Sequence, residues 1–119
     1  MKVAYLAAPY THKDANVRTV RFHSVNHAAA YLIKLGLHVF SPVSHTHPIA
    51  VQGDLPRGWD YWQAFDERMI QACDLLIVLT LDGWQQSIGI RYEIAIARDY
   101  NLPIRSLSME QVKCNQIYS

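Results

Sequence analysis

Residues 75–79 read Leu75-Leu76-Ile77-Val78-Leu79, an unbroken apolar run that follows Cys73-Asp74. A strand with one exposed face alternates apolar and polar residues, whereas a strand covered on both faces of a parallel sheet is apolar throughout. The run therefore predicts a strand buried inside a parallel sheet.

Three other short runs resemble it along the chain. Residues 3–7 are apolar and end before Pro9, residues 37–40 are followed by Ser41-Pro42, and residues 104–107 follow Pro103. We predict a strand at each of them, because prolines and polar turns separate them from their surroundings.

The segments between these strands have helical spacing. Apolar residues recur every three to five positions from about Ala15 to Leu35, before Gly36, and again from Trp62 to Cys73. Ser87 is a typical N-cap for a third helix that reaches about Tyr100. Alternating strands and helices predict an α/β fold: a three-layer Rossmann-like (flavodoxin-like) parallel sheet of four to five strands, with helices on both faces, as a single domain over residues 1–119.

In such folds, ligands bind beyond the carboxyl ends of the strands. Three predicted loops reach that edge, at residues 8–13, 41–58 and 80–86. The second contains prolines and polar residues, so we expect a long loop there. Long loops in compact domains are often functional.

The composition favours a small-molecule ligand. Eleven Lys and Arg residues balance ten Asp and Glu residues, which argues against binding to a nucleic-acid polymer or a membrane surface. The sequence shows no basic leader and no long apolar stretch, so we expect a cytoplasmic protein. Two distant cysteines, Cys73 and Cys114, indicate neither a disulfide scaffold nor a zinc site.

Two acidic residues lie on apolar faces of predicted helices. Glu93 has Ile90 before it and Ala97 after it at helical spacing, and Asp66 lies similarly between Trp62 and Ile70. Neither has a cation within helix-pair distance. A carboxylate there is either satisfied by a tyrosine or backbone donor or has a function. Asp74, at the opposite end of its strand, is expected to be structural.

The segment Ser87-Ile88-Gly89 precedes Glu93 by less than two helical turns. Free N–H groups at a helix start favour an anion, although a serine here is more often only a cap. A phosphate bound at this position would place a sugar near Glu93.

These residues resemble the nucleoside 2-deoxyribosyltransferase family and the related 2′-deoxynucleoside 5′-monophosphate N-glycosidases. The similarity lies in Tyr5-Leu6-Ala7-Ala8-Pro9, in residues 66–79, and in Ser87-x-Gly-x-x-x-Glu93 followed by Ala97 and Pro103. The resemblance implies that Glu93 is the nucleophile, that Asp66 assists the leaving base or positions the sugar, and that Tyr5 orients Glu93. Tyr5 is equally compatible with a core aromatic.

The sequence departs from the family pattern at several points. Ser87 replaces the aspartate of the transferases and matches a phosphate-binding serine of the monophosphate N-glycosidases, which favours a nucleotide. Ala8 stands where glycine is common. The chain also lacks the C-terminal strand and tail of longer relatives, so a homo-oligomer with a site completed by a neighbouring subunit is expected.

Histidines and tryptophans leave alternatives open. The pairs His45/His47 and His23/His27 lack a third ligand, so no metal and no cofactor is expected. Among the tryptophans, Trp84 is the preferred candidate over Trp59 and Trp62 for base stacking, although core packing explains most large aromatics. We predict that the substrate contacts Ala8, Pro9, Tyr10, His45, Trp84, Ser87 and Gly89.

The sequence therefore supports two hypotheses. The first is an enzyme that cleaves the N-glycosidic bond of a nucleoside or, preferably, its 5′-monophosphate, by hydrolysis or by transfer to another base. The second is a non-catalytic nucleotide-binding or sensing module, because fold alone does not determine function.

Overall fold

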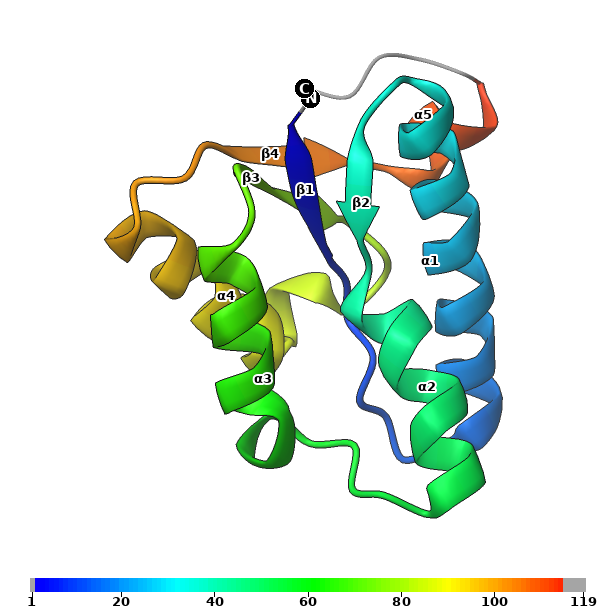
Figure 1. Cartoon of the computed structure of the whole chain (residues 1–119). Helices are drawn as coiled ribbons and strands as arrows, with labels where there is room; N and C mark the ends of the chain where they lie inside the picture. The colour runs from blue at the N-terminus through cyan, green and yellow to red at the C-terminus, as the bar shows by residue number, and fades with distance from the viewer. Residues whose placement is uncertain (1, 115–119) are drawn as a thin grey trace.

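The computed structural model describes residues 2–114 and confirms the predicted α/β architecture (Figure 1). Four parallel strands form one sheet in the order β2-β1-β3-β4. The elements along the chain are β1 (Val3–Ala7), α1 (Ala15–Lys34), β2 (His38–Phe40), α2 (Pro42–Gly53), α3 (Trp59–Gln71), β3 (Leu75–Leu79), the 3-10 turn η1 (Trp84–Gln86), α4 (Ile88–Asp99), β4 (Ile104–Leu107) and α5 (Met109–Lys113).

Helices cover both faces of the sheet, with α1, α2 and α5 on one side and α3 and α4 on the other (Figure 1). Alternate residues of each central strand point to opposite faces of the sheet and pack in separate hydrophobic cores, as the two-residue repeat of a strand requires. Ala4 and Leu6 pack with residues of α1, whereas Tyr5 and Ala7 pack with residues of α3 and α4. This alternation explains the continuous apolar runs, and it directs Tyr5 towards α4.

Local signals at the element ends agree with the sequence. Gly36 follows α1 with a φ of +100°, a conformation that favours glycine. At the start of β3, the Asp74 carboxylate accepts a hydrogen bond of 2.8 Å from the backbone N–H of Val3. Asp74 therefore joins two neighbouring strands, which agrees with its predicted structural role.

The predicted long loop over residues 41–58 is wrong, because most of it is the helix α2. Pro42 occupies the first turn, where a missing N–H costs nothing, but Pro48 lies inside the helix. Val43, Thr46 and Ala50 recur at helical spacing and are buried, and α2 packs against α1. Burial of this face outweighs the cost of the internal proline. The helix ends at Asp54, whose φ is +52°.

The chain connections change direction at the centre of the sheet, between β1 and β3. From β1 the chain passes to β2 on one side, and it then crosses to β3 on the other side of β1. Connections that diverge in this way leave a crevice at the carboxyl ends of the two strands. The loops after β1 and β3 flank this crevice.

Candidate functional site

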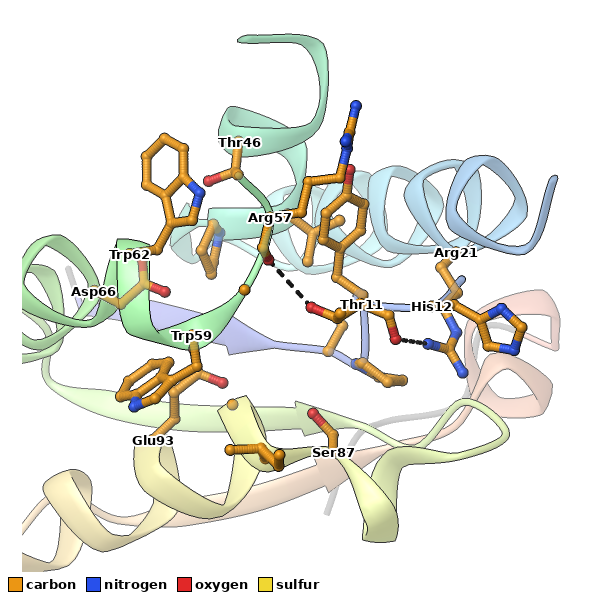
Figure 2. Close-up of a pocket in the computed structure, with 18 of the residues that line it drawn as sticks. Thr11, His12, Arg21, Thr46, Arg57, Trp59, Trp62, Asp66, Ser87 and Glu93 are labelled. Carbon is orange, nitrogen blue, oxygen red and sulfur yellow. Dashed lines mark hydrogen bonds between the residues drawn. The ribbon is translucent and has the colours of Figure 1, made fainter. Parts of the chain in front are cut away.

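A cavity of about 680 Å³ opens at this crevice (Figure 2). Its walls come from the loop after β1, the start of α2, the segment leading into α3, and the connection from β3 to α4. The lining residues include Ala8, Pro9, Tyr10, Thr11, His12, Arg21, Thr46, Arg57, Trp59, Trp62, Asp66, Gly83, Ser87, Gly89 and Glu93. Both unpaired acids predicted from the sequence therefore border one cavity.

Glu93 is held at this cavity by Tyr5. The Tyr5 hydroxyl donates a hydrogen bond of 2.5 Å to Oε2 of Glu93, and both residues are buried. Ile90 and Ala97, which flank Glu93 on α4, are packed in the same core. The structure therefore confirms that the Glu93 side chain points inward and lies next to Tyr5.

Burial raises the pKa of Glu93 from 4.5 to about 8. The hydrogen bond from Tyr5 lowers that pKa, whereas the nearby Asp66 carboxylate raises it further. Burial also raises the pKa of Tyr5 well above 10, so Tyr5 stays protonated and remains the donor. The charged form of Glu93 is thus destabilised in the free protein.

Asp66 lies on α3 and is only 8% exposed. Its Oδ1 atom is buried and has no hydrogen-bond partner among the described residues 2–114. Burial raises the Asp66 pKa to about 7. A side chain with this pKa can both donate and accept a proton near neutral pH, which is a requirement for general acid–base chemistry.

Ser87 and Gly89 form the start of α4 beside Glu93. The Ser87 hydroxyl caps the helix by accepting a hydrogen bond of 3.2 Å from the Ile90 N–H. A Cβ on Gly89 would lie 3.9 Å from the Ser87 hydroxyl oxygen and 4.0 Å from Oε1 of Glu93. Gly89 therefore leaves open the space between the two polar groups.

The loop after β1 supplies the predicted contacts Ala8, Pro9 and Tyr10, and all three line the cavity. Ala8 and Pro9 are buried next to the end of the strand. The Tyr10 hydroxyl lies 2.6 Å from Nδ1 of His47, which ties this loop to α2.

Two predicted contacts lie elsewhere, since neither His45 nor Trp84 is among the cavity-lining residues of the described chain. The His45 ring stacks on Phe65 at a centroid distance of 5.1 Å. Trp84 packs against the core formed with α3 and α4. Trp59 and Trp62 border the cavity instead, and Trp59 stacks on Tyr92.

Sequence reasoning also missed three basic residues of the cavity wall: His12, Arg21 and Arg57. His12 lies in a loop at the sheet edge that the strand pattern had already singled out, so its position was a usable signal. Arg21 lies within α1, and nothing in its local sequence indicates that it reaches the cavity.

No group of three or more His, Cys, Asp and Glu side chains within residues 2–114 is arranged to hold a metal ion. Cys73 and Cys114 are free thiols. None of the helices in the described part of the chain has the length and apolar character needed to cross a bilayer.

The chain belongs to a family described as a domain of unknown function, DUF1937, whose sequence profile matches residues 2–109. A comparison with curated proteins found no match. The family description assigns no activity.

Proposed function

We propose that this DUF1937 protein cleaves the N-glycosidic bond of a deoxynucleoside or, with better support, of a deoxynucleoside 5′-monophosphate. The main support is the Glu93 carboxyl group, which Tyr5 holds at 2.5 Å beside an open cavity. An acid buried without a cation reduces stability, and a catalytic role accounts for its presence.

The chemistry proceeds in two displacements. In the first, Oε1 of Glu93 attacks C1′ of the sugar, and the C1′–N bond breaks with its electron pair moving to the base. Asp66 donates a proton to the departing base. The products are a free base and a glycosyl ester of Glu93, which is ordinary covalent catalysis.

In the second displacement, a water molecule attacks C1′ of the ester. Its proton passes to the Asp66 carboxylate, and the Glu93 carboxylate leaves. A second base can replace water as the attacking group, in which case the reaction is a transfer. The Asp66 pKa of about 7 suits both of its steps.

The start of α4 is the proposed seat of the 5′-phosphate. The Ser87 hydroxyl can donate its proton to an anion, as can the N–H groups of Ile88 and Gly89, whereas the Ile90 N–H already donates to the Ser87 oxygen. The helix dipole favours negative charge there. Gly89 adds no side chain between this seat and Glu93. Phosphate at Ser87 therefore brings the sugar within reach of the carboxylate.

The raised Glu93 pKa favours a second candidate, a non-catalytic nucleotide-binding module. A carboxyl group with a pKa of about 8 is mostly protonated at neutral pH, and the protonated form is a poor nucleophile. A protonated Glu93 can instead donate a hydrogen bond to a bound sugar.

The enzyme and the binding module are distinguished by whether the protein releases free base from a nucleoside or nucleotide. Purified protein is incubated with a panel of deoxynucleosides, ribonucleosides and their 5′-monophosphates, and free base is followed by chromatography between pH 6 and pH 9. An enzyme releases base from at least one compound, with a bell-shaped rate profile whose maximum lies between pH 7 and pH 8, because Glu93 must be ionised and Asp66 protonated.

Glu93→Gln is the decisive variant, and Glu67→Gln, an exposed acid on α3, is its matched control. In an enzyme only the Glu93 variant loses base release, while both variants still bind nucleotide. Binding by calorimetry with no base release from any compound would contradict catalysis and favour the binding module.

A further inference from the structure

Residues at one end of the cavity have no part in the proposed arrangement of a nucleoside monophosphate. Trp59, Trp62 and Asp66 lie at one end of the view, and His12 and Arg21 lie at the other, with Ser87 between them (Figure 2). A base near Asp66 and a phosphate at Ser87 would leave the cationic end unfilled.

Arg21 is held rigidly at this end. It projects from α1, its Nη1 donates to the Thr11 carbonyl at 3.1 Å, and its Nη2 donates to the Asp82 carbonyl at 3.2 Å. These carbonyls belong to the loops after β1 and β3. The guanidinium group therefore joins the two loops that border the crevice.

The backbone at Gly83 lies close to this guanidinium group. Its φ is +88°, and a Cβ there would lie only 2.8 Å from Nη2 of Arg21. Any other residue would be strained and would displace the guanidinium group. The backbone of the loop after β3 thus lies close against the guanidinium group of Arg21.

The contacts of Arg21 with the two loops use only some of its hydrogen-bond donors. A guanidinium group has five N–H donors, and the two hydrogen bonds to carbonyls use two of them. Asp82 is its charged neighbour, yet no carboxylate within residues 2–114 lies within salt-bridge distance of Arg21. The remaining donors leave capacity for an anion in the cavity.

His12 adds a donor at the same end. Its Nδ1 atom accepts a hydrogen bond of 3.0 Å from the Asp14 N–H, so the neutral ring carries its proton on Nε2. Its backbone carbonyl accepts from Arg18, which holds the loop in place. Two side chains with unused N–H groups thus border the part of the cavity beyond Ser87.

We propose that Arg21 and His12 bind a second phosphate, so that the substrate is a nucleoside 5′-diphosphate or a longer 5′-polyphosphate. This proposal rests on the proposed function, because it takes the base, sugar and first phosphate as placed there. The net charge of +1 argues against the alternative of an extended nucleic acid.

The test measures binding rather than catalysis, in Glu93→Gln protein that does not consume its ligands. Deoxynucleosides, their 5′-monophosphates and their 5′-diphosphates are titrated by calorimetry in the presence of EDTA, because divalent cations would mask the phosphate charge. We expect the diphosphate to bind about tenfold more tightly than the monophosphate, as a charge-assisted contact predicts.

Arg21→Met should remove this preference and leave monophosphate affinity within about twofold, because the lost contact is to the second phosphate only. His12→Ala is a second variant that leaves the Arg21 clamp intact, and it should reduce the preference in part. Arg98→Met, an exposed arginine at the end of α4, is the control and should change neither affinity.

Equal binding of mono- and diphosphate, no binding of either, or equal weakening of both by the two variants would overturn the proposal. Base release from monophosphates with no preference for diphosphates would leave the proposed function standing without the second phosphate site. A diphosphate preference that depends on Arg21, without any base release, would support the phosphate site and contradict the enzyme.

Discussion

The two ends of the cavity hold their charges in opposite ways. At one end, Glu93 and Asp66 are buried with no cation beside them, and both have raised pKa values. At the other end, Arg21 is half-buried and donates to two backbone carbonyls. The acidic end therefore lowers the stability of the free protein, whereas the guanidinium group at the other end keeps two stabilising hydrogen bonds and has donors left for a ligand.

The two ends of the cavity are therefore expected to differ in how much their residues contribute to stability and to function. Residues of the acidic end should be costly to the fold and essential to the reaction, as strained groups at functional sites often are. Residues of the cationic end should support the fold modestly and affect ligand binding. Each of the following predictions tests one side of this contrast.

After the loss of base release in Glu93→Gln, the largest effect is expected for Asp66→Asn. If Asp66 protonates the leaving base, its loss should lower kcat by about 10²–10⁴-fold, the range for a general acid. The measurement is the rate of base release at saturating substrate. Glu67→Gln, the exposed acid next to Asp66 on α3, is again the control. A base with a low pKa needs little protonation, so equal losses for good and poor leaving bases would contradict the assignment.

Glu93→Gln should stabilise the protein above about pH 5. The Glu93 pKa is about 8 in the folded state and about 4.5 when unfolded, so the folded state holds a proton that the unfolded state has lost. Stability therefore falls as the pH rises from 4.5 to 8. Removing the acid should raise the free energy of unfolding by about 2–4 kcal/mol at pH 8.

Urea unfolding at pH 5, 7 and 8.5 measures this effect. The difference in the free energy of unfolding between the variant and the wild type should increase across the series. The variant's own stability should still fall with rising pH, but less steeply, because Asp66 remains and has a pKa of about 7. A variant that is less stable than the wild type at pH 8.5 would show that the Glu93 charge is stabilised by some other group.

Gly89→Ala should weaken substrate binding without harming the fold. The added methyl group would meet Trp59 at 3.8 Å, an ordinary contact, and would lie 4.0 Å from Oε1 of Glu93. We expect KM to rise about tenfold, because one methyl group in a pocket is worth about 1–3 kcal/mol. Thermal unfolding should be unchanged or slightly improved. An unchanged KM would place the sugar away from Gly89.

Arg21→Met should destabilise the protein by only about 1 kcal/mol, since two solvent-accessible hydrogen bonds to carbonyls are lost. The loss should be similar from pH 5 to pH 9, unlike the effect at Glu93, because arginine stays charged throughout. Urea unfolding of Arg21→Met beside Arg98→Met measures it. A loss that varies strongly with pH would mean that the two ends of the cavity are coupled.

The strands and most helices were predictable because their signals lie in neighbouring residues. The run at residues 75–79, the Ser87 cap and the Gly36 termination depend on local burial and backbone preference. The same local rules failed at α2, where Pro48 suggested a loop. Packing of one helix face against α1 decided that segment, and this contact joins parts of the chain that are apart in sequence.

The candidate site divides in the same way. The sequence by itself determined that Glu93 and Asp66 are acids on apolar helix faces, because helical spacing assigns a residue to a face. Helical spacing did not place Tyr5 beside Glu93, a contact that only the family resemblance implied, and nothing in the sequence indicated that Arg21 reaches Asp82. The tertiary structure brings these pairs together across 88 and 61 positions. Those contacts depend on the order in which parallel strands assemble, and local periodicity contains no record of that order.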